Sequence, residues 1–246
     1  MTKKELVREY IQKHRYFSLA QIVQDVNLDR KLVKDYLFQL KQENVVFDSG
    51  YGFFSTIAEK FPFMSIRRVE VIRQDLKKNY PLVDFLIWDT KIFASLYHHT
   101  QTHHITFVEV EKDLVFPIHE YLYGKYRGVL KERRVKSFFE EFDVTLDPVV
   151  VRAMPSRSPQ EGNTPALEKI LVDMYIDMDK YAYIGNSDYF ELWRDLIRLY
   201  RINIRDLLSY GNRRKCLGSL YPQLTDNKNN YAIDFCHLIA KVGKKL

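Results

Sequence analysis

Apolar side chains recur at three- and four-residue spacing in three segments of the first 42 residues, and this spacing predicts three amphipathic helices. Thr2, Ser18 and Asp29 precede the segments, and their side-chain oxygens suit the free backbone N–H groups of a first helical turn. Glu5 and Gln21 follow the first two caps by three residues, which completes two capping boxes. The predicted helices span residues 3–14, 19–26 and 30–42.

Two short β-prone runs follow the third helix, at Val45–Phe47 and Phe53–Ser55. Between them lies the sequence Asp-Ser-Gly-Tyr-Gly. A glycine-bearing turn between such runs predicts a β-hairpin. Three short helices followed by a hairpin is the order of a winged helix-turn-helix domain. In that domain the third helix enters the DNA major groove and the hairpin reaches the DNA backbone. We therefore predict a winged helix DNA-binding domain over residues 1–60.

The third predicted helix carries its basic residues away from its apolar stripe. Such side chains are available to phosphates and base edges because packing does not use them. The candidate DNA-binding residues are Arg30, Lys31, Lys34 and Lys41 on this helix and Tyr51 in the hairpin turn. Asp35 and Glu43 dilute the positive charge, so a winged helix that contacts another protein is the alternative.

Beyond residue 60 the pattern changes, because runs typical of buried strands alternate with helical stripes. Predicted strands are Val83–Trp88, Ile105–Glu109 and Val149–Met154; predicted helices begin after Ser65 and cover Thr90–His98 and Lys112–Tyr123, the last interrupted near Pro117. This alternation predicts the α+β class, with a small mixed α/β core over about residues 65–155. Such a core distantly resembles restriction-nuclease-like folds.

A polar loop over residues 155–163 leads to Thr164-Pro165, a cap followed by proline, after which the pattern is helical. Later helices are predicted over residues 187–200, 203–214 and 231–242. The helical part, about residues 164–246, and the α/β core make up a second domain, residues 61–246. Its first helix carries Glu168, Lys169 and Asp173, which we interpret as a salt-bridged helix face.

Composition limits the classes of protein. Hydrophobic residues make up 46%, and only 9 glycines and 8 prolines are present, which excludes low-complexity and broadly disordered chains. The opening sequence and the lack of a long apolar run predict no signal peptide and no membrane span. Cys216 and Cys236 are too few for a disulfide framework, so we expect a cytoplasmic protein. A net charge of +6 makes polyanions plausible partners.

A metal-dependent nuclease is the enzymatic alternative. It would centre on Asp84, Glu109 and Glu111, because such enzymes hold Mg²⁺ with carboxylates from two neighbouring strands. They also need a lysine two positions after the acidic residue and on the same face, whereas strand alternation places Lys112 on the face opposite Glu109 and Glu111. We therefore predict a protein without a catalytic site.

Other cofactor chemistry finds little support in the sequence. His98, His99, His103 and His104 are potential metal ligands, but no cysteine or carboxylate lies among them, and we predict no metal site. Neither cysteine has the neighbouring residues of a nucleophile, and no glycine-rich phosphate loop is present. The sequence therefore predicts no cofactor.

Four ordered segments resemble the motifs of AbiEi-type proteins, the antitoxins of type IV toxin–antitoxin and abortive-infection operons. They are Tyr80–Thr90 (YPLVDFLIWDT), Thr106–Lys112 (TFVEVEK), Thr164–Asp173 (TPALEKILVD) and Tyr200 with Leu207–Lys215 (LLSYGNRRK). The resemblance implies a cytoplasmic bacterial protein that represses its own operon by binding promoter or operator DNA. It also implies that the chain opposes a co-encoded nucleotidyltransferase-like toxin without a stable complex. Residues 98–104 and 121–160 depart from the pattern.

The last of these motifs ends in the basic residues Arg213, Arg214 and Lys215. Cations at a helix C-terminus interact favourably with the helix dipole, and this is a sufficient structural role. Tyr200 and Tyr210 lie nearby, and basic residues beside aromatic rings are also typical of nucleic-acid contacts. The three residues are therefore candidates for nucleic-acid or antitoxin function. A helical region that docks a protein partner is a third alternative for the chain.

Overall fold

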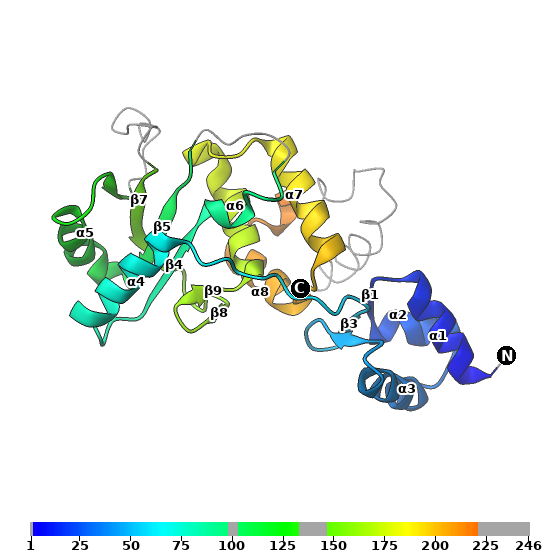
Figure 1. The fold of residues 1–246 in the computed structure, drawn as a ribbon. Coiled ribbons are helices and arrows are strands. Elements are labelled where there is room, and N and C mark those ends of the chain that lie inside the picture. Colours follow the sequence, from blue (N-terminus) through cyan, green and yellow to red (C-terminus); the bar gives the residue numbers. More distant parts are fainter. Residues whose placement is uncertain (1, 98–102, 133–146, 221–246) are drawn as a thin grey trace. The chain divides into compact units, whose positions relative to one another are not determined.

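The computed structural model describes residues 2–97, 103–132 and 147–220 (Figure 1). The chain forms two compact units, the first made of Met1–Phe61 with Trp193–Leu246 and the second of Pro62–Leu192. The boundary expected near residue 60 coincides with the first division. The part from Trp193 onward, which the sequence pattern assigned to the second domain, groups with the N-terminal residues instead. The helix predicted over residues 231–242 lies outside the described residues.

The first unit begins with the three predicted helices, α1 (Lys3–Lys13), α2 (Leu19–Val26) and α3 (Arg30–Gln42). Thr2 and Ser18 form the expected capping boxes, and the Asp29 carboxylate accepts hydrogen bonds from the first turn of α3. Asn27 ends α2 in the left-handed region with φ 50°, a conformation that Asn adopts more readily than most residues. The apolar stripes of the three helices pack on one another around Val7, Ile22, Val33, Leu37 and Leu40.

A three-stranded antiparallel sheet in the order β1-β3-β2 completes the N-terminal part of this unit. β2 (Phe47–Asp48) and β3 (Phe53–Ser55) are the predicted hairpin. The third strand, β1 (Tyr16–Ser18), pairs with β3 and was not predicted. It is only three residues long and ends in the residue that caps α2, so it leaves no period-two pattern to recognise.

The C-terminal part of the first unit docks on this sheet. The Tyr16 hydroxyl donates to the Tyr200 carbonyl at 2.7 Å, and the Ser49 hydroxyl donates to the Ile202 carbonyl at 2.6 Å. The backbone N–H of Ile204 donates to the Ser49 carbonyl at 2.8 Å. These bonds join the hairpin to the start of α8 (Ile204–Arg213), which Asn203 caps. Residues about 150 positions apart in sequence are thus held side by side.

The second unit is built on a four-stranded mixed sheet of β4 (Phe85–Asp89), β5 (Thr106–Val110), β7 (Val149–Ala153) and β6 (Val129–Lys131), in that order. β4 and β5 are antiparallel, and the other two pairs are parallel. The three predicted strands are confirmed within one or two residues. β6 was not predicted.

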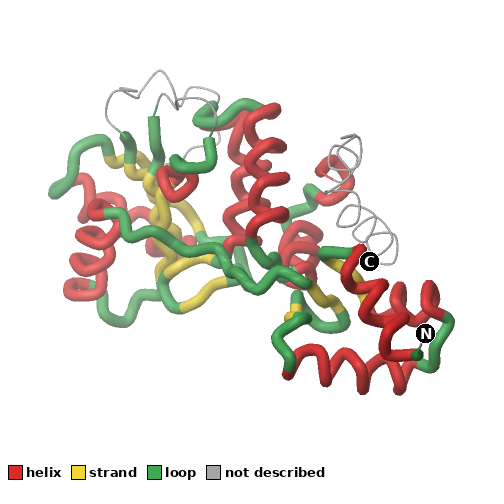
Figure 2. Tube along the Cα trace, turned by 45° about the vertical axis from the view of Figure 1, so that its right-hand side comes forward, coloured by secondary structure: helices red, strands yellow, loops and turns green. Residues whose placement is uncertain are grey.

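Helices cover both faces of this sheet (Figures 1 and 2). On one face, α4 (Arg67–Asn79) and α5 (Val115–Tyr123) pack their apolar stripes on the side chains of alternate strand residues. On the other face lies α6 (Leu167–Tyr181), followed by α7 (Asn186–Leu199), whose last residues belong to the first unit. Short 3-10 helices follow β4 (Thr90–Phe93) and β5 (Lys112–Leu114). The described residues therefore form a mixed α+β protein.

The starts of two helices and the effect of one proline differ from the predictions. Thr164-Pro165 does not start a helix but forms strand β9 (Thr164–Pro165), which pairs with β8 (Gln160–Glu161), and α6 starts after Ala166. Ile66, not Ser65, precedes α4, and no side chain caps that helix. Pro117 does not interrupt α5, because it lies in the first turn, where its missing N–H has no helical partner.

Gly50 and Gly52 in the hairpin turn offer a matched test of the docking between the hairpin and α8. Both have positive φ, 102° and 78°, which L-residues rarely adopt. A Cβ on Gly50 would lie 2.7 Å from the Asn203 side chain and 2.8 Å from the Arg205 Cβ, whereas one on Gly52 would meet nothing within 4 Å.

Gly52→Ala should therefore cost about 1–2 kcal/mol through backbone strain alone. Gly50→Ala should cost about 1–3 kcal/mol more than Gly52→Ala, because the segment around Asn203 and Arg205 must also move to make room for the new Cβ. Urea unfolding of both variants checks this difference. Equal losses would show that the contact between residues 50 and 203–205 is absent in solution.

Candidate functional site

The basic residues of α3 share one side of the helix. By the 3.6-residue period, Arg30, Lys31, Lys34, Phe38 and Lys41 fall within a stripe about 100° wide, beside the buried Val33, Leu37 and Leu40. We call these five residues the α3 stripe. Phe38 stands out because 63% of its surface is exposed. The sequence analysis did not identify Phe38 as a candidate. An aromatic residue outside the apolar stripe of the helix was the feature that could have identified it.

The cations of the α3 stripe differ in whether they are already paired. Arg30, Lys31 and Lys34 are exposed, and none forms an ion pair within the described part of the chain. Lys41 is only partly exposed and forms an ion pair with Asp48 of β2, so its charge is largely compensated. The same ion pair shows that the α3 stripe borders the hairpin. Three of the four predicted helix cations are thus available to an anion.

Tyr51 lies at the tip of the hairpin, where 85% of its surface is exposed. The Arg205 guanidinium of α8 lies 5.6 Å from the centre of its ring. The structure therefore leaves Tyr51 exposed at the hairpin tip, and it adds a nearby cation that no local sequence pattern associates with the hairpin.

The basic residues at the end of α8 have a different setting. The guanidinium groups of Arg213 and Arg214 lie 5.6 and 5.8 Å from the ring centre of the buried Tyr210. Arg213 also donates to the Ser209 hydroxyl at 2.7 Å, and Arg214 to the Tyr210 hydroxyl at 3.2 Å. Lys215 is exposed and adopts φ 56° as the chain leaves the helix. These contacts give the two arginines a role at the helix terminus.

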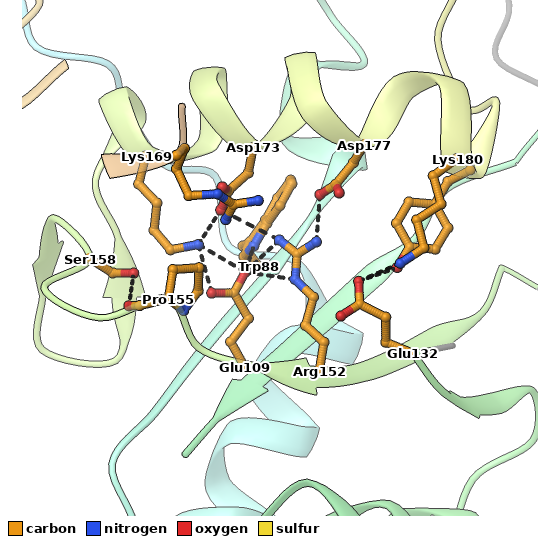
Figure 3. Close-up of polar contacts among 12 residues, drawn as sticks. Trp88, Glu109, Glu132, Arg152, Pro155, Ser158, Lys169, Asp173, Asp177 and Lys180 are labelled. Atoms are coloured by element: carbon orange, nitrogen blue, oxygen red, sulfur yellow. Dashed lines mark hydrogen bonds and ion pairs between the residues drawn. The ribbon is translucent and has the colours of Figure 1, made fainter. Parts of the chain in front are cut away.

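The second unit contains a cluster of charged side chains between its sheet and α6 (Figure 3). Glu109 of β5 and Arg152 of β7 are paired positions on neighbouring parallel strands and project on the same face. Lys169, Asp173 and Asp177 follow one another at four-residue spacing along α6 and point toward them. We call these five residues the buried ion cluster, since none is more than 4% exposed.

Glu109 is the centre of the cluster. Its Oε1 accepts hydrogen bonds from the Arg152 Nη2 at 2.7 Å, the Lys169 Nζ at 2.8 Å and the Trp88 indole N–H at 3.2 Å. Arg152 also pairs with Asp173 and Asp177, and Lys169 with Asp173. The salt-bridged helix face expected for Lys169 and Asp173 is confirmed, but it faces the protein interior instead of solvent.

Electrostatics in the cluster favour ionised Glu109. Burial raises its pKa, but the nearby charges of Arg152 and Lys169 outweigh this effect and lower the pKa to about 2. Burial raises the pKa of Asp177, and its neighbour Asp173 adds to the rise. Three carboxylates face two cations, and the raised pKa of Asp177 favours its protonated form.

The nuclease residues considered from the sequence are not brought into one accessible site. Glu109 is fully buried and held by two cations, whereas Asp84 and Glu111 are exposed. Among the described residues, no group of three or more His, Cys, Asp or Glu side chains is placed to hold a metal ion. His98 and His99 lie outside the described residues, and His103 is buried with its Nε2 3.3 Å from the Tyr181 carbonyl.

Two further sequence observations can be placed. Cys216 is buried, and its thiol lies 3.6 Å from the Gly211 carbonyl, while Cys236 lies outside the described residues. In the part of the chain that the structure describes, no helix is both long and apolar enough to cross a membrane.

These features define a two-unit α+β protein with a cationic helix face in one unit and a buried ion cluster in the other. Residues 32–230 match the model of a family of unknown function (DUF6577), and the chain belongs to that family. The matched region begins inside α3 and includes the hairpin, the whole buried ion cluster and α8. No curated protein matches the chain.

The buried ion cluster predicts a strong dependence of stability on Lys169. Lys169→Met leaves three buried carboxylates with Arg152 alone, so we expect it to lower the free energy of unfolding at pH 7 by about 3–5 kcal/mol. Lys78→Met, on the exposed side of α4, is the matched control and should change it by less than about 0.5 kcal/mol. Urea unfolding followed by circular dichroism measures both.

The same comparison has a predicted pH dependence. The pKa of Glu109 is lowered from its ordinary 4.5 to about 2 on folding, so its ionisation stabilises the fold above about pH 4.5. That contribution is lost as the pH falls toward 2. Because Lys169 is one cause of the low pKa, the difference in stability between wild type and Lys169→Met should shrink over this range. A difference independent of pH would contradict the assignment.

Proposed function

We propose that the chain is a DNA-binding transcriptional regulator whose α3 lies in the major groove. The observation that carries the proposal is that Arg30, Lys31 and Lys34 are exposed, unpaired within the described chain and on the side of α3 that borders the hairpin. A winged helix-turn-helix domain contacts DNA through this combination of surfaces. DNA phosphates would then form the ion pairs that these three side chains do not form within the described chain.

The proposal rests on local geometry as well as charge. α2 and α3 pack on each other, and Asn27 turns the chain sharply between them. Their shared core fixes the backbone of α3, so little backbone conformational entropy is lost when the helix binds. The exposed tip of the hairpin supplies the second contact, which is expected at the DNA backbone.

We further propose that the protein represses its own operon and acts as the antitoxin to a co-encoded nucleotidyltransferase-like toxin. The resemblance to AbiEi-type proteins supports this part. Under this proposal the second unit does not catalyse a reaction, although its core distantly resembles restriction-nuclease-like folds. The pairing of Glu109 with Arg152 and Lys169 favours this over the nuclease, since a carboxylate bound by two cations is a poor Mg²⁺ ligand.

The α3 stripe is tested by Lys31→Ala/Lys34→Ala. If Arg30, Lys31 and Lys34 each neutralise one phosphate, together they contribute about −2.7 per protomer to the slope of log K against log salt, and the double variant makes the slope less negative by about 1.8. The double variant should bind the duplex upstream of its own gene at least about tenfold more weakly than wild type near 0.1 M salt. The loss of affinity should be the same for duplexes of other sequences, because phosphate contacts do not read the bases. Fluorescence anisotropy at several KCl concentrations measures both quantities.

Lys77→Ala/Lys78→Ala removes the same charge from the exposed side of α4 and should leave the slope unchanged. If the two double variants weaken binding equally, the effect comes from net charge alone and α3 is not the reading helix.

Phe38 generates a separate prediction about sequence specificity. An exposed aromatic side chain among phosphate-binding cations is placed to contact the 5-methyl group of thymine in the major groove. Duplex made with deoxyuridine in place of thymidine lacks this methyl group. Wild type should bind such DNA about threefold to fourfold more weakly per contact, given about 0.8 kcal/mol for one buried methyl. Phe38→Ala should bind both duplexes equally. A variant that still discriminates would exclude Phe38 from the contact.

A further inference from the structure

Two arginines from the C-terminal part of the first unit lie against aromatic rings of the hairpin. The Arg201 guanidinium is 4.8 Å from the ring centre of Phe47, and that of Arg205 is 5.6 Å from the ring centre of Tyr51. Neither side chain forms an ion pair in the described part of the chain. Both therefore keep an uncompensated charge at a defined place on the hairpin.

The backbone holds these arginines in position independently of their side chains. The Arg201 N–H donates to the Glu59 carbonyl at 2.7 Å, and Ser49 bonds to residues on both sides of Asn203. The close approach of Gly50 to Asn203 and Arg205 leaves no space for another side chain between the hairpin and α8. The backbone that carries the two arginines is thus fixed before any ligand binds, which reduces the entropy lost on binding.

We propose that Arg201 and Arg205 are phosphate-binding residues and that they form, with Tyr51, the second DNA contact of the first unit. This inference rests on the proposed function and extends it to a segment far from α3 in sequence. Guanidinium groups bind phosphate oxygens with two parallel N–H donors, and the aromatic rings beneath them leave those donors free. The ligand is the sugar–phosphate backbone of duplex DNA flanking the groove that α3 occupies.

The test is Arg201→Ala/Arg205→Ala in the full chain, with the same upstream duplex and salt series. Loss of two phosphate contacts should raise the salt slope by about 1.8 and weaken binding at least about tenfold near 0.1 M salt. Lys77→Ala/Lys78→Ala is again the control of equal charge.

Conservative variants separate binding from folding. Arg205→Lys keeps a cation and should keep the salt slope, whereas Arg205→Gln is similar in length and should raise it by about 0.9. A folding defect alone would affect the two variants without regard to charge, and thermal melting of each variant checks that the unit is intact.

The outcomes distinguish the inference from the proposed function. If Lys31→Ala/Lys34→Ala loses binding while Arg201→Ala/Arg205→Ala binds with unchanged slope, the second contact is overturned and the DNA-binding function stands. If the wild-type chain does not bind the duplex, both are overturned. Weaker binding with a raised slope in both double variants supports both.

Discussion

The second unit depends on compensation of charge in the interior of the protein. Five ionisable side chains are buried between the sheet and α6, and each would carry a large desolvation penalty if left alone. They are tolerated because Glu109 and Arg152 are neighbours across two parallel strands and meet the four-residue repeat of α6. A shift of α6 by one residue would separate these partners. The cluster therefore specifies a single register of α6 on the sheet.

In the first unit, the constraint is the hydrophobic core that α1, α2 and α3 share. The core uses Val33, Leu37 and Leu40 of α3 and so leaves the α3 stripe outside. The segment before α8 then fastens the hairpin through backbone and hydroxyl bonds. A rigid helix face and a rigid hairpin are suitable for a partner of fixed shape, and duplex DNA has regularly spaced charges. The proposed function follows from this rigidity combined with the unpaired cations.

Under the proposed function, the two units have different roles. In the first unit, the charges of Arg30, Lys31, Lys34, Arg201 and Arg205 are not compensated by an ion pair in the described chain, whereas the five charged side chains of the buried ion cluster pair with one another. Under the proposed function, the uncompensated cations of the first unit contact the anionic partner. The family match covers parts of both, from inside α3 to beyond α8, which places the hairpin, Arg201, Arg205 and the buried ion cluster in one family sequence.

The sequence alone determined the features that depend on neighbours along the chain. The capping residues Thr2, Ser18 and Asp29, the three N-terminal helices and the three buried strands β4, β5 and β7 are local patterns, and they were predicted correctly. Strand β1 depended on pairing with the distant strand β3 and was missed. The start of α6 was misplaced because Thr164-Pro165 pairs with the nearby Gln160–Glu161 as a strand. Lys169 and Asp173 were recognised as a pair, but only the tertiary structure supplied Glu109 and Arg152 as their partners. The same holds for Arg205, which lies about 150 residues from Tyr51 in the chain. Local rules act over one or two helical turns, whereas burial, charge compensation and the composition of a binding surface are decided by which distant segments pack together.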